Sequence, residues 1–175
     1  MVREAHNHPI VVVGPHAESN SLDGPIAIAL DGSKVAEEAL LGAVAWSRLF
    51  DTPIHLVQVL PPSAFTGETG WRATDYLESV RAHFAVGGLD CESYVVVGDD
   101  PVTGLVNHLR DHQCSLVAMA THARRGVARE AIGSVTMGVI AASPCAVCAM
   151  HPDAVASLEL PAGAPSEHAQ MMIRG

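Results

Sequence analysis

The sequence predicts an α/β fold in which helices cover both faces of a doubly wound parallel β-sheet. Short apolar runs rich in β-branched residues alternate with segments in which apolar residues recur every three or four positions, and this alternation of strands and helices is typical of parallel sheets. Hydrophobic residues make up 49% of the chain, which allows a sizeable core, whereas aromatic residues make up 4%. A core of small side chains favours helices packed closely on a sheet.

The N-terminal part of the chain predicts two strands followed by a helix. The β-branched runs at residues 9–14 and 25–30 lie between turn-forming residues, which is typical of strands. From Ser33 onward, apolar residues at a spacing of three to four predict an amphipathic helix that ends near Phe50. Either Asp31 or Ser33 has a side chain suited to cap its N-terminus.

The middle of the chain continues the alternation. An apolar run predicts a strand at residues 53–60, and the Pro-, Gly- and Thr-rich residues 61–70 predict a loop. Apolar positions on one side of residues 71–86 predict a helix that Gly87 ends. Residues 91–97 first alternate and then become apolar, which predicts a strand at an edge of the sheet.

The last part of the domain predicts a helix, a strand, a helix and a strand. Pro101 stands in the first turn of a helix predicted over residues 101–112, where its missing N–H costs nothing. An uninterrupted apolar run at residues 115–120 predicts the central buried strand. A helix at residues 134–142 and a strand at residues 145–150 follow.

Charge and hydropathy argue against two classes of partner. The formal net charge is −9, whereas a nucleic-acid-binding protein needs a basic surface. Residues 131–152 carry no Asp, Glu, Lys or Arg, but Pro144 interrupts this stretch, so a helix followed by a strand fits better than a membrane span. Residues 1–7 are polar and lack the apolar region of a secretion signal, so we expect a cytoplasmic protein.

The cysteines include one C-x-x-C pattern, formed by Cys145 and Cys148. This pattern is typical of redox or metal sites when it lies on a turn or a helix start. Here it follows Pro144 within a predicted strand, where residues three apart face opposite sides of the sheet. Two separate buried thiols are therefore favoured over a redox or metal role, and a reducing compartment is expected.

The segment after the central strand has the layout of a phosphate-binding loop. Residues 120–136 contain a histidine and three arginines, and Gly133 and Ser134 then begin a helix. The unpaired N–H groups of a helix N-terminus attract anions, and small residues let a phosphate come close. Asp31 also follows a predicted parallel strand and is expected to face the same crevice. Such a loop equally serves as a plain strand-to-helix connection, so both interpretations stay open on these residues.

The ten histidines mostly stand singly in the predicted elements. His108 and His112 are four residues apart on one helix face, which is a spacing that metal ligands use. No third ligand is evident in the sequence, so a solvated helix face is favoured and no metal site is predicted. No catalytic set is evident either, and we expect no enzymatic activity, beyond a slow nucleotide hydrolysis that a pair of Asp31 and His122 could support.

Together, these motifs resemble the universal stress protein family over residues 25–150. The resemblance implies a five-stranded sheet of order 3-2-1-4-5 and usually a homodimer, in which the last strand pairs with its copy. It also implies ATP binding in many members, through a G-x-x-G-x(9)-G-[ST] motif. The motifs that carry the resemblance are Asp31-Gly-Ser33, Gly98-Asp-Asp-Pro101, the strand that ends before Thr121-His122, Gly133-Ser134-Val135 and Ser143-Pro-Cys145.

Gly133 and Ser134 match the last two positions of the ATP motif, whereas Ala120 and Ala123 replace its first two glycines. The resemblance implies that Asp31 contacts the ribose and that Val59 and Met119 line the adenine pocket. It also implies that four residues lie near the phosphates, namely His122, Ser134, Val135 and Thr136. Ser134 and Thr136 equally suit helix caps. The implied nucleotide site comprises Asp31, Val59, Met119, Ala120, His122, Ala123, Gly133, Ser134, Val135 and Thr136.

The expected organisation is a strand and linker at residues 1–24, one domain at residues 25–150 and a disordered tail at residues 151–175. Residues 8–15 resemble the last strand of a preceding domain in a tandem member, and we expect residues 10–13 to add to a sheet edge. We predict a stress-response protein that binds ATP, AMP or cyclic AMP, with magnesium only alongside ATP. The alternative is a nucleotide-free, dimeric interaction module, which the two alanine replacements favour.

Overall fold

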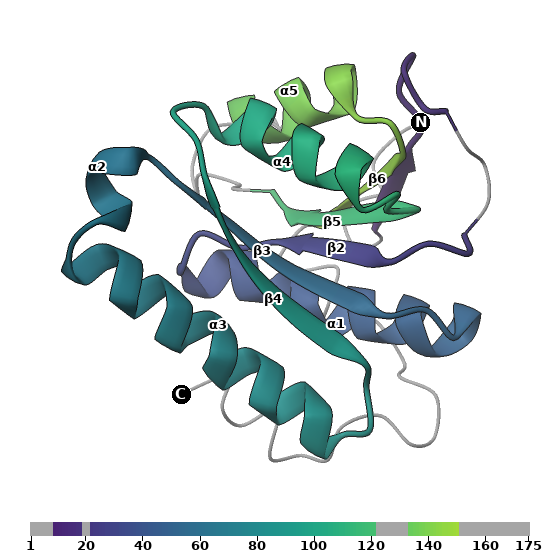
Figure 1. The fold of residues 1–175 in the computed structure, drawn as a ribbon. Helices are drawn as coiled ribbons and strands as arrows, with labels where there is room; N and C mark the ends of the chain where they lie inside the picture. The colour runs from purple at the N-terminus through teal and green to yellow at the C-terminus, as the bar shows by residue number, and fades with distance from the viewer. Residues whose placement is uncertain (1–8, 19–21, 122–132, 151–175) are drawn as a thin grey trace, which may run out of the picture.

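The computed structural model describes residues 9–18, 22–121 and 133–150, which form a six-stranded sheet with helices on both faces (Figure 1). The strand order is β1-β6-β5-β2-β3-β4. Neighbouring strands are parallel except β1 and β6, which are antiparallel. The strands are β1 Ile10–Val12, β2 Ile26–Ala29, β3 Ile54–Leu60, β4 Cys91–Val97, β5 Leu116–Ala120 and β6 Ala146–Met150.

Two longer helices cover each face of the sheet (Figure 1). On one face lie α1 (Lys34–Phe50) and α3 (Glu68–Val86), and on the other lie α4 (Pro101–Asp111) and α5 (Ser134–Ala142). The predicted doubly wound α/β fold is therefore confirmed. Within the described ranges, no helix combines the length and the hydropathy that a membrane span needs.

β2 lies at the centre of the sheet, and the chain builds outward from it in both directions. β3 and β4 follow on one side, and β5 and β6 follow on the other. If β2 is counted as strand 1 and the strands that follow it along the chain as strands 2 to 5, the order from β4 to β6 is 3-2-1-4-5. This is the order that the resemblance implied. The carboxyl ends of β2 and β5 therefore lie side by side where the strand order reverses, which is the usual ligand position in such sheets.

The two faces of the sheet bury two separate hydrophobic cores, and the C-x-x-C cysteines contribute to different ones. Cys145 lies on the face that α4 and α5 cover, whereas Cys148 lies on the face that α1 and α3 cover. Both thiols are free and buried, and burial raises the pKa of Cys148 to about 11. The prediction of two separate core thiols is confirmed.

The segment between β3 and β4 differs from its prediction, because residues 61–70 are not all loop. Pro62–Phe65 forms the short helix α2, and α3 begins at Glu68 rather than at residue 71. Pro62 suits the first turn of α2, where a missing N–H costs nothing. Glu68 forms an ion pair with Arg72 one turn later, at 2.5 Å, which favours an earlier start for α3.

β1 extends the sheet beyond β6, which confirms the expected addition of an N-terminal strand to a sheet edge. Val11 lies opposite Cys148 in the antiparallel register. Gly14, just after β1, lies against the backbone of α5, since a Cβ added there would be 2.1 Å from the carbonyl oxygen of Ile140. The chain can pass this close to α5 only because Gly14 has no side chain.

Replacing Gly14 with alanine tests whether this close contact fixes β1. The added methyl group would overlap the carbonyl oxygen of Ile140, so β1 has to shift relative to α5 and β6. We expect Gly14→Ala to lower the free energy of unfolding by about 1–3 kcal/mol, measured by urea denaturation. Gly98→Ala is the matched control, because a Cβ there meets no atom closer than 3.8 Å. Equal stabilities for the two variants would contradict the contact.

Candidate functional site

The turn after β2 holds a carboxylate at the predicted crevice. Asp31 is exposed, and its Oδ1 accepts a hydrogen bond from the Ser33 N–H at 2.9 Å. Gly32 between them has a φ of 79°, which favours glycine. Ser33, rather than Asp31, caps α1, since its Oγ accepts a hydrogen bond from the Ala36 N–H at 3.2 Å. These two hydrogen bonds order the turn that carries the Asp31 carboxylate.

The N-terminus of α5 is suited to bind an anion. Its N-cap residue is Gly133, which offers no side chain to the N–H groups of the first turn. Ser134 and Val135 are exposed, whereas Thr136 is buried, and neither hydroxyl residue is the cap. N–H groups without intrahelical partners carry partial positive charge, so a phosphate can bind to them.

Three further predicted residues lie near the carboxyl ends of β3 and β5, on different faces of the sheet. Val59 and Met119 both pack beneath α4 and α5, with Ala29 of β2 on the same face. Val59 is half-buried, whereas Met119 is only 6% exposed. Ala120 packs on the opposite face, which α1 and α3 cover. The strand order thus brings these residues to the same end of the sheet, where the strands have their carboxyl ends. They lie on different faces of the sheet there.

Two residues of the predicted site, His122 and Ala123, lie outside the described residues. The same is true of the three loop arginines and of the predicted tail at residues 151–175. Their predicted roles therefore stay predictions.

Gln58 is a polar residue near the same edge that the sequence did not single out. It lies in β3 and is 8% exposed, and its Oε1 accepts no hydrogen bond from the described part of the chain. Its Nε2 lies 4.0 Å from where a Cβ of Gly32 would be, so the amide is beside the turn after β2. Buried polar atoms nearly always have a partner, so this oxygen is a candidate contact for a ligand. The signal for Gln58 in the sequence was its position as a polar residue within a mostly apolar strand.

The prediction of a solvated helix face at His108 and His112 is wrong for His108, which is 5% exposed. Gly104, one turn earlier, lies against Val59 of β3, so position 108 on the same side of α4 also faces the sheet. His112, at the C-cap of α4, is exposed. The nearby donors of His55 and Cys114 come from elsewhere in the chain, which is why spacing along α4 did not indicate them.

The fold and this edge define a doubly wound α/β domain with a candidate binding site for a small anionic ligand. The model of the universal stress protein family matches residues 24–151, and the chain belongs to that family. Comparison with curated protein sequences finds no match.

Solved structures of universal stress proteins share this fold. One from Archaeoglobus fulgidus is 24% identical with a TM-score of 0.61, and the match covers 71% of this chain and 98% of that one. A universal stress protein in complex with cAMP is 22% identical with a TM-score of 0.60, covering 75% and 99%. Another from Archaeoglobus fulgidus, in complex with dAMP, is 22% identical with a TM-score of 0.58, covering 73% and 99%.

Proposed function

We propose that this chain is a cytoplasmic stress-response protein that binds an adenine nucleotide at the carboxyl ends of β2 and β5. ATP is the proposed ligand, and AMP or cyclic AMP could use the same contacts. The observation that carries the proposal is the N-terminus of α5, which has no side-chain cap from the described residues. Two family structures in complex with cAMP and dAMP support it.

Each part of a nucleotide has a suitable partner at this edge. A phosphate would accept hydrogen bonds from the first-turn N–H groups of α5 and from the Ser134 hydroxyl. Asp31 suits the ribose, because a carboxylate accepts hydrogen bonds from hydroxyl groups. Val59 and Met119 offer apolar surface to the adenine. Magnesium would accompany ATP alone, held mainly by its phosphate oxygens.

We further propose that the nucleotide is a bound signal rather than a substrate. Phosphoryl transfer needs a group that orients the attacking water and positive charge that stabilises the transition state. Asp31 is the only titratable side chain among the described residues of this site. Residual hydrolysis would depend on His122 together with Asp31 and would be slow.

The alternative function is a nucleotide-free interaction module that acts as a homodimer. Ala120 in place of the first motif glycine and the burial of Met119 favour it, because both limit the room for a nucleotide. In this alternative the two copies meet at an open sheet edge, β1 or β4, since β6 is already paired with β1.

Asp31→Ala tests nucleotide binding. The substitution removes the proposed acceptor for the ribose hydroxyls, and hydrogen bonds to a charged group contribute about 1.5–3 kcal/mol, so affinity should fall roughly 10- to 150-fold. Titration calorimetry with ATP, AMP and cyclic AMP on nucleotide-stripped protein measures the change. Analysis of nucleotide released from freshly purified, denatured protein identifies any ligand retained from the cell.

Asp75→Ala is the matched control, because Asp75 is an exposed carboxylate on α3, on the other side of the sheet from α5. It should leave the affinity unchanged. A folded wild-type chain that releases no nucleotide and gives no heat with any of the three would rule out nucleotide binding and favour the interaction module.

Removal of residues 1–16 tests what β1 does for assembly. The truncated chain would expose the hydrogen-bonding edge of β6, which can then pair with another copy. We expect a larger mass by light scattering coupled to gel filtration, together with a lower melting temperature. An unchanged mass and an unchanged melting temperature would show that β1 neither stabilises the domain nor covers an assembly edge.

A further inference from the structure

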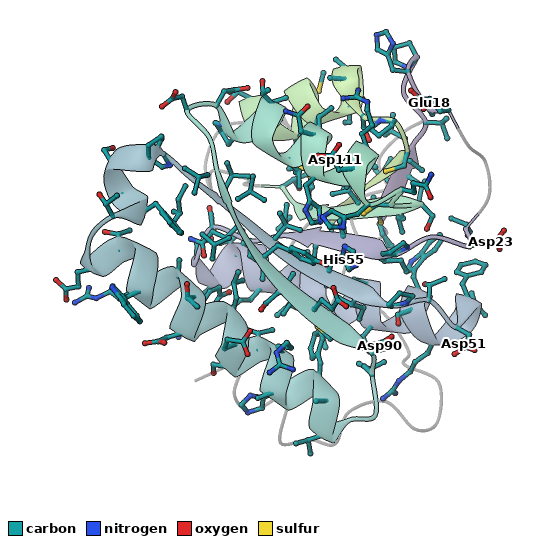
Figure 2. All side chains as sticks on the ribbon, viewed as in Figure 1. Glu18, Asp23, Asp51, His55, Asp90 and Asp111 are labelled. Carbon is teal, nitrogen blue, oxygen red and sulfur yellow. The ribbon has the colours of Figure 1, made fainter. Side chains whose placement is uncertain are left out.

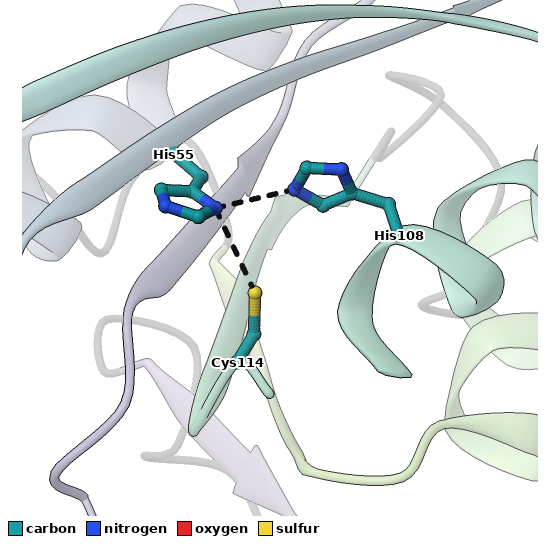
Figure 3. Close-up of side chains that lie close together, drawn as sticks. All are labelled: His55, His108 and Cys114. Carbon is teal, nitrogen blue, oxygen red and sulfur yellow. Dashed lines mark hydrogen bonds between the residues drawn. The ribbon is translucent and has the colours of Figure 1, made fainter. Parts of the chain in front are cut away.

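A cluster of two imidazoles and a thiol lies between α4 and the sheet (Figure 3). His55 comes from β3, His108 from α4, and Cys114 from the turn that precedes β5. The Nδ1 of His55 is 3.3 Å from the Nε2 of His108 and 4.0 Å from the Sγ of Cys114. All three donor atoms lie within 4.8 Å of one another. Three separate elements thus direct one nitrogen or sulfur donor each to the same point.

The three side chains are buried and keep their donor atoms away from bulk water. Their exposed fractions are 6% for His55, 5% for His108 and 6% for Cys114. Burial disfavours the charged form of both rings, which lowers the pKa of His55 and lowers the pKa of His108 to about 4. Neutral imidazoles have a free nitrogen lone pair, which is the form that binds a metal.

We propose that His55, His108 and Cys114 bind a zinc ion, in a site separate from the nucleotide edge. The site uses Nδ1 of His55, Nε2 of His108 and the thiolate of Cys114. Imidazole and thiolate are the donors that zinc prefers, whereas magnesium and calcium prefer oxygen.

One donor pair has the spacing of a tetrahedral zinc site, and the side chains have to rotate to bring all three donors, which lie within 4.8 Å of one another, onto one ion. With Zn–N distances of about 2.0–2.1 Å and Zn–S distances of about 2.3 Å, tetrahedral donor atoms lie roughly 3.3–3.6 Å apart. The observed distance of 3.3 Å between the two nitrogens meets this value, and the sulfur at 4.0 Å is slightly farther away. Zinc binds the thiolate, so its binding releases the Cys114 thiol proton to solvent.

A surface cleft lies beside the cluster. A surface cleft of about 620 Å³ between β4 and α4 has Tyr94, His108 and His112 in its lining. The ring of His112 lies 4.2 Å from that of His108, centre to centre, and the ring of Tyr94 lies 4.7 Å from it. The cleft therefore reaches the cluster at His108, which is the side from which an ion would enter. A water molecule would complete the tetrahedral coordination.

The cluster lies at the end of the sheet opposite the candidate nucleotide site. His55 is near the start of β3, on the side where Asp51 and Asp90 precede β3 and β4 (Figure 2). An ion here would join β3, α4 and the start of β5. Binding of the ion should therefore stabilise the folded domain even when no nucleotide is bound.

The test uses full-length protein, reduced and freed of metal with a chelator, and Co²⁺ as a spectroscopic probe of the zinc site. We expect one equivalent of Co²⁺ to give the visible d–d bands of a tetrahedral ion and a thiolate-to-cobalt charge-transfer band in the near ultraviolet. Zn²⁺ should displace the Co²⁺ and raise the melting temperature. The charge-transfer band is the decisive signal, because histidines elsewhere in the chain cannot produce it.

Variants assign the ligands. Cys114→Ser and His108→Gln should each weaken Zn²⁺ binding at least about 100-fold, since loss of even an outer partner of a ligand costs about 10- to 100-fold. The matched controls are Cys91→Ser, at a buried thiol of β4, and His83→Gln, at an exposed histidine of α3, and both should bind as the wild type does.

Two results would overturn the proposal, and the first is measured on the wild-type chain, so it does not depend on how well the variants fold. One is a folded wild-type chain that takes up Co²⁺ without the thiolate band, which would make the cluster a hydrogen-bonded part of the core. The other is a thiolate band of full intensity in Cys114→Ser, which would assign the sulfur ligand to another cysteine.

Discussion

The close packing of α4 is the contact on which both candidate sites depend. A Cβ at Gly104 of α4 would lie 2.7 Å from Cγ1 of Val59 in β3, and a Cβ at Gly138 of α5 would lie 2.8 Å from Cγ2 of Val102 in α4. Glycine at these positions lets α4 lie directly on β3 and lets α5 lie directly on α4. The first contact sets the depth at which His108 is buried. The second contact sets the position of the N-terminus of α5 relative to the sheet.

The two ends of the sheet present different donors and acceptors, and β3 contributes to both. At the carboxyl ends of the strands, the Asp31 turn and the backbone N–H groups of α5 suit a ligand with hydroxyl and phosphate groups. At the amino ends, imidazole nitrogens and a thiol suit a transition-metal ion. β3 places Gln58 toward the first end and His55 toward the second. Because the sites share no residue, each can be filled without displacing the ligand of the other.

The fold could be predicted because each element carries a local pattern, and even the opposite directions of Cys145 and Cys148 follow from the period of a strand. The residues at the carboxyl edge followed from the family motif. The cluster at the other end could not be predicted in this way. His108 and Cys114 are 53 and 59 residues away from His55, so the three meet only when β3, α4 and β5 assemble. Periodicity describes neighbours along the chain and carries no information about contacts at that separation.

The antiparallel pairing of β1 with β6 determines which strand can pair with β6 at this edge of the sheet. A strand tethered to its own domain by a short linker competes at an effective concentration in about the millimolar range. A strand from another molecule has to displace β1, which its linker keeps close to β6. Dilution or overproduction of the protein therefore has little influence on how β6 is paired. The occupancy of this edge is a property of the single chain, independent of its abundance.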